Sequence, residues 1–238
     1  MGWGKAVYDR PMATTPVETA YDPLRPPGAV MVQRDGLPVV GHYGSVSAEI
    51  AVCTKAAGLV DRSSVRQLAI SGPEGLLDHV LGAAAPDGAP SAGSASCIAG
   101  TWCCRVTARR AIVAGGPSAV TRWRQVTSRA ISTAGLAVST ERLVDSAALS
   151  LVGPRATRVI RSGGLPADMA VGEVAEATLA GFPVSVVRED GDHYLLLFEH
   201  GHPPAVWQAL WDAGHEHGLA PVGNEALELL QAAHRPMD

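Results

Sequence analysis

The sequence predicts an α+β fold built from two related strand–helix units. An apolar strand, a Gly-Pro pair and an amphipathic helix follow one another twice, and the pairs Gly72-Pro73 and Gly153-Pro154 lie 81 residues apart. A repeat at this distance indicates a duplicated unit, although strand-to-helix turns also favour these residues without duplication. The hydrophobic content of 47% and the charged content of 18% are typical of a folded globular protein.

The first part of the chain combines a proline-rich arm with one helix, one strand and a second helix. Residues 1–27 are rich in proline and lack periodicity, so we expect an extended arm, with order beginning near Gly28. Ser47 is a candidate cap of the first helix, and Gly58 is suited to its end. A strand is expected from Val65 to Ile70, and a helix that opens at Pro73 should end at Gly82.

The rest of the chain alternates between strand-like and helix-like segments after a low-complexity linker at residues 83–96. The turn at Asp190-Gly191 between two apolar runs is a strong hairpin signal. The expected strands are Ile98–Val106, Arg110–Val113, Leu143–Val152, Pro183–Val187 and Tyr194–Phe198, and the expected helices are 117–135, 203–216 and 224–233.

Charge and hydropathy exclude several classes of function. The net charge of −4 gives no electrostatic reason to expect a nucleic acid partner. No apolar run approaches the roughly 20 residues needed to span a bilayer. The N-terminus has no apolar segment of the kind found in secretory signals, so we expect a cytoplasmic protein that does not enter a membrane.

Neither the cysteines nor the histidines form a recognisable metal site. The adjacent pair Cys103-Cys104 has no Cys-x-x-Cys partner, and at least one of the two thiols is expected to be a small buried hydrophobe. In His215-Glu216-His217, neighbouring helical positions do not share a face. We therefore predict no metal.

A series of short motifs identifies a family resemblance. In order they are His42-Tyr43-Gly44-Ser45, Ala57-Gly58-Leu59, Asp61-Arg62-Ser63 and Ser71-Gly72-Pro73. This series resembles the glycine-cleavage T-protein (aminomethyltransferase) family, which includes folate-binding demethylating enzymes and the small subunit of heterotetrameric sarcosine oxidase. The resemblance extends to about Gln231. It implies a folate-binding domain at residues 28–238, expected to lack the family's C-terminal barrel.

The resemblance also implies an architecture, a cofactor and a substrate class. Two ferredoxin-like half-units, at about residues 39–135 and 143–233, should surround a central folate-type cleft. Tetrahydrofolate is the expected cofactor, and a small amine is the expected substrate. A homodimer and a heteromeric oxidase complex are both compatible with the resemblance.

This sequence departs from the family where the folate is bound. The family's aspartate falls in the stretch Ile98–Trp102, yet no acidic residue occurs between Gly88 and Glu141. The family's pterin-binding glutamate falls at or near His193, and the arginine of the last helix at or near Gln231. A carboxylate beside the pterin amines would accept hydrogen bonds and stabilise positive charge. Either another acid serves here, or the cleft binds its ligand without that chemistry.

Six residues are the resulting candidates for the site. Thr101 is expected to hydrogen-bond the reacting amine and, with His193, to be catalytic. Trp102 should stack on a pterin, and His193 should contact the pterin edge; an exposed strand histidine is the alternative for His193. The complete set of cofactor-binding candidates is Tyr43, Trp102, Glu189, His193 and Gln231.

Three functions are compatible with these residues. The first is a folate-binding one-carbon transferase, similar to aminomethyltransferase, that acts on a small amine with non-standard site residues. The second is a non-catalytic subunit of a folate-linked amine oxidase complex. The third is an enzyme that uses the cleft for chemistry without folate.

Overall fold

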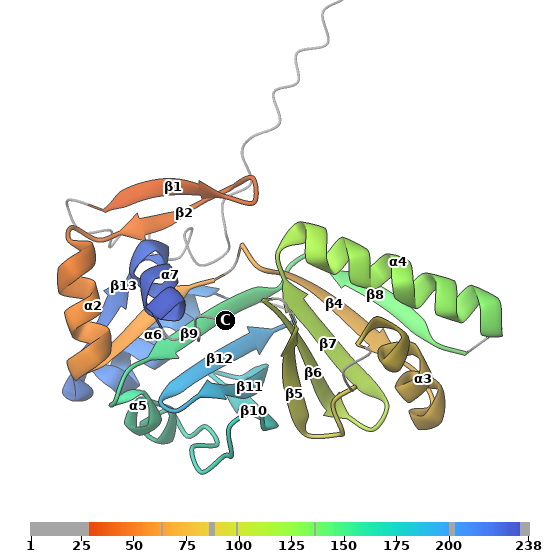
Figure 1. Cartoon of the computed structure of the whole chain (residues 1–238). Helices are drawn as coiled ribbons and strands as arrows, with labels where there is room; N and C mark the ends of the chain where they lie inside the picture. The colour runs from red at the N-terminus through yellow and green to blue at the C-terminus, as the bar shows by residue number, and fades with distance from the viewer. Residues whose placement is uncertain are drawn as a thin grey trace, which may run out of the picture.

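The structure is a computed structural model that describes residues 29–62, 64–85, 89–98, 100–135, 137–199 and 203–233. These residues form three β-sheets with helices packed on them, which confirms the predicted α+β class (Figure 1). The predicted arm at residues 1–27 lies outside the described residues.

The chain begins with a hairpin that the sequence prediction did not include. The first elements are β1 (Val30–Arg34), β2 (Leu37–His42), α2 (Val46–Lys55) and β3 (Ala57–Asp61). Ser45, rather than Ser47, caps α2 by accepting a hydrogen bond from the Ala48 N–H. Gly58 lies inside β3 instead of ending the helix, because this segment pairs with strands from the distant end of the chain.

Two long segments then repeat one order of elements: strand, helix, three strands, helix and strand. The first segment contains β4 (Arg66–Ser71), α3 (Glu74–Ala84), β5 (Ser94–Ile98), β6 (Thr101–Thr107), β7 (Arg110–Gly115), α4 (Pro117–Ala134) and β8 (Ser139–Leu143). The second contains β9 (Ala147–Val152), α5 (Ala156–Ser162), β10 (Val174–Leu179), β11 (Phe182–Asp190), β12 (His193–Phe198), α6 (Pro203–Gly214) and β13 (Leu219–Val222). A short 3₁₀ helix, His215–His217, precedes β13, and α7 (Asn224–Ala233) follows it.

The two segments also order their strands in the same way. The five-stranded sheet has the order β5-β6-β7-β4-β8, and the six-stranded sheet has the order β10-β11-β12-β9-β3-β13. Corresponding strands occupy corresponding places, except that β3 is inserted between β9 and β13. The strand expected at 143–152 begins later, at Ala147 of β9, and Leu143 instead ends β8 of the other sheet. β3 precedes both segments, yet it completes the sheet of the second one.

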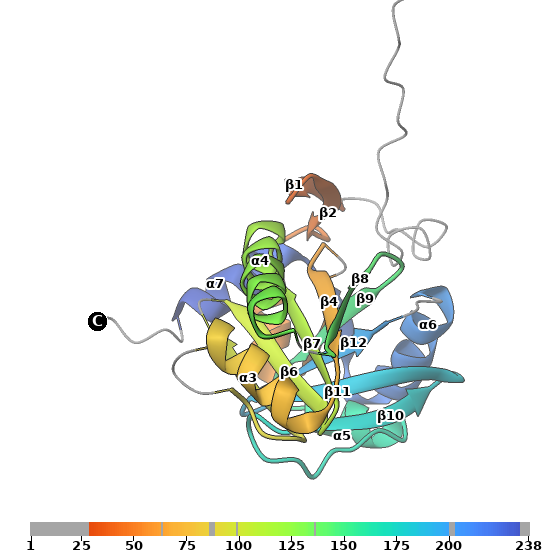
Figure 2. The ribbon, with the colours of Figure 1, turned by 90° about the vertical axis from the view of Figure 1, so that its right-hand side faces the viewer.

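Each of the two larger sheets buries both faces. Helices α3 and α4 cover the outer face of the five-stranded sheet, and α5 and α6 cover that of the six-stranded sheet (Figure 2). The inner faces pack against each other through a shared apolar core that includes Cys104, Ile112, Val187 and Leu195. Helices α2 and α7 cover the inner face of the six-stranded sheet around β3 and β13. The five-stranded sheet and α7 therefore cover different parts of the inner face of the six-stranded sheet, and they meet at a junction over it.

Candidate ligand site between the two sheets

A cavity of about 300 Å³ lies at this junction. Its wall combines side chains from β5 and β6, from the β11–β12 hairpin, from the end of β3 and from α7. The lining residues are Arg62, Cys97, Gly100, Trp102, Glu189, Asp190, His193 and Gln231. Four of the predicted site residues, Trp102, Glu189, His193 and Gln231, are thus brought together from three separate parts of the sequence.

The β5–β6 hairpin supplies the aromatic wall. Trp102 is directly opposite Cys97 in the antiparallel register, so the two side chains share one face of the sheet. Trp102 also packs partly buried against the core between the sheets. The indole ring is therefore held by the apolar interior along one part of its surface and borders the cavity with another.

The β11–β12 hairpin supplies the acidic wall. Asp190 pairs with His193, and the register shifts between Arg188 and Asp190, so Glu189 is the extra residue of a bulge. The Glu189 Oε1 atom accepts a hydrogen bond of 3.2 Å from Arg62 Nη1, and the two side chains are only 8% and 16% exposed. This ion pair joins the end of β3 to the hairpin, and both of its residues line the cavity.

Helix α7 brings Gln231 to the rim, and buried polar contacts fix its start. The Asn224 side-chain amide donates 3.1 Å hydrogen bonds to the carbonyls of Val40 and Asp61. The Gly223 N–H donates to Glu49 Oε2 at 2.8 Å. Because Asp61 adjoins Arg62, these contacts fix the position of α7 relative to the acidic wall.

Thr101 and Tyr43 are not brought to this cavity. Thr101 precedes Trp102 on β6, and adjacent strand residues point to opposite faces. Its side chain is 2% exposed and lines a small cavity beside Trp123 of α4. Tyr43 lies in the loop between β2 and α2, outside the lining set, where its N–H donates to Glu49 Oε1 at 2.6 Å.

A second cavity of about 410 Å³ shares a wall with the first one. Asp190 and His193 line both cavities, and Asp192 and Gly153 line only the second. His193 therefore borders both cavities, and each cavity is also lined by carboxylates: Glu189 and Asp190 in the first, Asp190 and Asp192 in the second. This arrangement is suited to holding a flat polar ring against Trp102 and a cationic group beside the aspartates.

Four of the lining residues were not among the predicted site residues: Arg62, Cys97, Gly100 and Asp190. Arg62 belongs to the Asp61-Arg62-Ser63 motif, so its place in the resemblance was an available signal. No feature of the sequence indicated Cys97, because its position opposite Trp102 follows only from the register of the hairpin. The neighbouring Cys103 and Cys104 are buried, and burial raises the pKa of the Cys103 thiol to about 12. These two thiols are therefore packing residues, as the sequence suggested for at least one of them.

The described residues contain no cluster of three or more His, Cys, Asp or Glu side chains that could hold a metal ion. In the 3₁₀ helix, His217 Nε2 instead contacts Ser162 Oγ, and His215 Nδ1 contacts the carbonyl of Asp212. Across the same ranges, every helix is too short or too polar to cross a membrane.

The fold and the cavity define a class: an α+β protein with a repeated order of elements and a ligand-sized cavity between its two larger sheets. The sequence profile described as the GCVT N-terminal domain matches residues 20–234, and the chain belongs to this family. The predicted family is thereby confirmed. The chain is also 37% identical to an aminomethyltransferase of Frankia alni over 105 residues, which are 43% of this chain and 28% of that protein.

Solved structures share the fold. The glycine cleavage system aminomethyltransferase T from Bartonella henselae superimposes with a TM-score of 0.72 at 20% identity, over 90% of this chain and 60% of that one. A chain of the heterotetrameric sarcosine oxidase from Corynebacterium sp. U-96 gives 0.55 at 19% identity, over 74% and 94%. This chain thus spans less than two thirds of the aminomethyltransferases that it matches.

Proposed function

We propose that this protein binds tetrahydrofolate in the cavity between the sheets and transfers a one-carbon group to or from a small amine. The observation that carries the proposal is the convergence of Trp102, Glu189, His193 and Gln231 on one cavity. Membership in the GCVT family supports the choice of folate over other flat heterocycles.

The residues of the cavity fit a reduced pterin. An indole face stacks on flat heterocycles, and the contact of Trp102 with the core holds its ring in place at the cavity. A pterin presents several N–H donors along one edge, and carboxylates accept such bonds strongly. Glu189 uses Oε1 toward Arg62 and retains Oε2 as an acceptor, and Asp190 lies beside it. The volume of about 300 Å³ is at the lower end of the range for small-molecule sites, with Gln231 at the rim.

The adjoining cavity is suited to the amine. Bound tetrahydrofolate would supply the nitrogen atoms that carry the one-carbon group. Asp190 and Asp192 would attract a protonated amine, and an imidazole between the two compartments can exchange a proton near neutral pH. His193 is therefore the proposed catalytic residue. Thr101 has no role in this proposal, because it lines a different cavity.

Isothermal titration calorimetry with tetrahydrofolate tests the binding. Saturable binding at a 1:1 ratio is expected, and Trp102→Ala should weaken it about tenfold or more, since base–aromatic stacking contributes about 1–3 kcal/mol. Trp211→Phe is the control, because Trp211 lies on α6 and packs against the core on the outer face of the six-stranded sheet, outside the proposed folate site. Absence of binding by the folded wild-type protein would refute the folate proposal.

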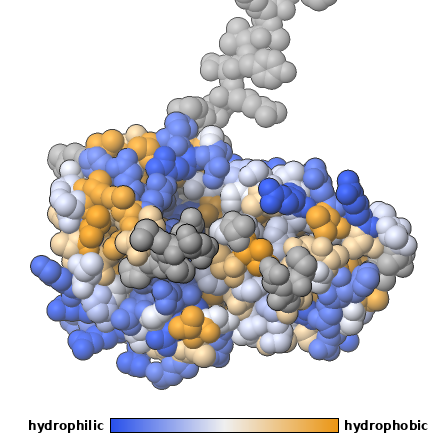
Figure 3. Space-filling view, viewed as in Figure 1, coloured by the Kyte–Doolittle hydropathy of each residue, from blue (hydrophilic) through white to orange (hydrophobic). Residues whose placement is uncertain are grey.

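A second candidate is a non-catalytic, folate-binding subunit of an amine oxidase complex. Two observations favour it. The five-stranded side of the cavity lacks a carboxylate, since residues 89–140 contain no acid. Hydrophobic side chains also gather on the face formed by β1–β2, α2 and α7 (Figure 3), where Leu229 is 54% exposed and Ile50 is partly buried. Such a patch is typical of a protein interface.

A turnover assay separates the two candidates. The purified chain is incubated with tetrahydrofolate and a panel of small N-methyl amines, and the transfer of the methyl group is followed as formation of methyltetrahydrofolate and of the demethylated amine. Turnover that His193→Gln lowers by tenfold or more, with folate affinity retained, supports the transferase. Folate binding without turnover by the chain alone supports the subunit.

A further inference from the structure

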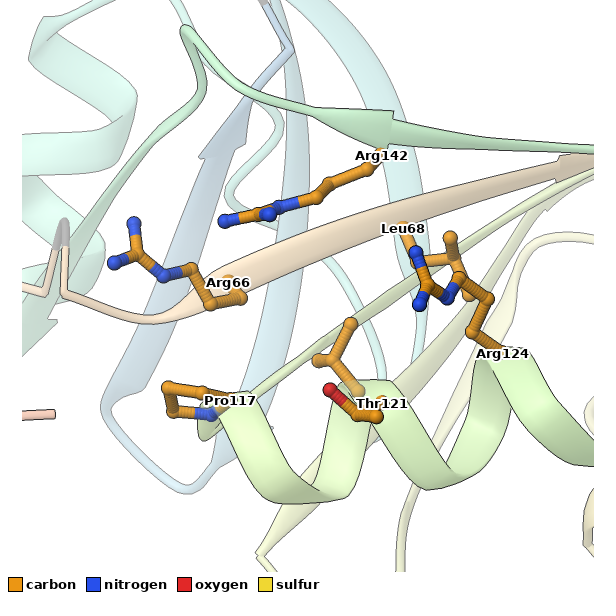
Figure 4. Close-up of a pocket in the computed structure, with 7 residues that line it drawn as sticks. Arg66, Leu68, Pro117, Thr121, Arg124 and Arg142 are labelled. Atoms are coloured by element: carbon orange, nitrogen blue, oxygen red, sulfur yellow. The ribbon is translucent and has the colours of Figure 1, made fainter.

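A separate cavity of about 200 Å³ lies on the outer face of the five-stranded sheet, beside the first turns of α4 (Figure 4). Three of its lining residues are arginines, and none of the seven is acidic. The set is Arg66, Leu68, Pro117, Val120, Thr121, Arg124 and Arg142. This cavity shares no residue with the proposed folate site and lies on the opposite face of the sheet.

Strand register and helix spacing explain why the arginines converge. Arg142 of β8 is opposite Leu68 of β4, and Arg66 is two residues from Leu68, so all three side chains share the face beneath α4. On α4, Thr121 and Arg124 follow Pro117 by four and seven residues, which puts them on one side of the helix. Figure 4 shows Arg66 and Arg142 on the sheet side and Arg124 on the helix side of this hollow.

The charges of these arginines are not balanced within the part of the chain that the structure describes. No salt bridge joins Arg66, Arg124 or Arg142 to an acid there, whereas Arg62, Arg105, Arg110 and Arg161 each have one. Glu141 adjoins Arg142 but points to the other face of β8. The acid nearest to the start of α4 is Asp35, whose Oδ2 lies 3.8 Å from the position of a Cβ at Gly116. Arginine stays protonated at all physiological pH values, so the three side chains repel one another.

We propose that this arginine-lined cavity binds a dianionic phosphate group, either free phosphate or the phosphate of a small ester. The planar guanidinium fork matches phosphate oxygens, and three such forks exceed what a single carboxylate can neutralise. The Thr121 hydroxyl adds a donor. The start of α4 has Gly116 as its cap and no side-chain capping bond, so its first-turn N–H groups favour an anion as well.

Calorimetric titration of the full chain with sodium phosphate at constant ionic strength tests the proposal. Saturable binding of one phosphate per chain is expected. Arg142→Gln and Arg66→Gln should each weaken it about tenfold or more, as expected for loss of a hydrogen bond to a charged group. Arg129→Gln is the matched control, because Arg129 is exposed on the same helix outside this cavity and should leave the affinity unchanged.

Each outcome decides the question. No saturable binding, equal heats from sodium chloride, or the same affinity in Arg142→Gln as in the wild type would overturn the proposal. Tighter binding of glycerol phosphate than of inorganic phosphate would identify an ester as the source, and equal affinity would identify the free anion. Trp102→Ala should retain phosphate binding, so this test is independent of the proposed folate site.

Discussion

Glu49 is expected to be one of the most important polar residues for stability. Its buried carboxylate accepts two backbone hydrogen bonds, from the Tyr43 N–H at 2.6 Å and from the Gly223 N–H at 2.8 Å. These bonds connect the loop after β2 to the residue that precedes α7. Gly223 lies 174 residues after Glu49 in the sequence. Glu49→Ala would remove both acceptors and leave the Gly223 N–H buried without one.

The expected cost follows from these two contacts. A hydrogen bond to a charged group contributes about 1.5–3 kcal/mol. The Gly223 bond is buried and should contribute near the upper end, whereas the Tyr43 N–H is only part-buried and can recover a bond to water. We expect Glu49→Ala to lower the free energy of unfolding by about 3–4 kcal/mol, which corresponds to a Tm about 10 °C lower for a chain of this size.

Urea unfolding followed by circular dichroism measures this change. Glu228→Ala is the matched control: it also removes one carboxylate near α7, but its ion pair with Arg34 is exposed. The control should change the free energy of unfolding by less than about 1 kcal/mol. Equal effects of the two substitutions would refute the assignment of Glu49 as a buried clamp.

Four further predictions concern two glycines and the thiols. Gly153→Ala should destabilise the protein by about 3 kcal/mol or more, because its φ is +118° and a Cβ would lie 2.5 Å from the Cys53 carbonyl oxygen. Gly82→Ala, in an open helical position of α3, should instead raise the free energy of unfolding by about 0.5–1 kcal/mol in the same urea assay. Ellman's reagent at pH 8 should label only the exposed Cys97 thiol in the native chain, and labelling of Cys103 before unfolding would contradict its burial. Burial raises the pKa of Cys53 and Cys103 from 9.0 to about 12. The contribution of these two protonated thiols to the free energy of unfolding should therefore be fully present below pH 9 and be lost as the pH rises toward 12.

Local signals in the sequence were sufficient for much of the fold. Helix α4 was predicted at nearly its observed bounds, because Pro117 begins it and Gly135, at φ +60°, ends it. The β11–β12 hairpin was predicted from Asp190-Gly191. The β1–β2 hairpin was missed although its turn has the same sequence signal, the pair Asp35-Gly36. Both residues have positive φ, as a two-residue turn requires.

The place of β3 could not be predicted from local pattern. It pairs in parallel with β13, from the far end of the chain, and so completes a sheet otherwise made by the second segment. No periodicity within 57–61 specifies that partner, because a strand buried on both faces has only an apolar pattern. This placement also brings Arg62, at the end of β3, to Glu189. The long-range pairing of β3 therefore accounts both for its unexpected place in the sheet and for the position of Arg62 in the site.

The alternation of strand side chains constrains the chemistry of the site. Within the β5–β6 hairpin, Cys97, Gly100 and Trp102 line the cavity, whereas Thr101 lies on the opposite face. Among these, none carries a carboxylate, so any acid that acts in the cavity must come from the opposing hairpin, as Glu189 or Asp190. Glu189 is already paired with Arg62, which leaves Asp190, shared between both cavities, and Asp192, in the second cavity, as the acids available to a cationic amine. If the protein is a transferase, its acidic group therefore approaches the substrate from the six-stranded sheet. The aspartate that the family carries in the stretch 98–102 would then be replaced by an acid on the opposite side of the cavity.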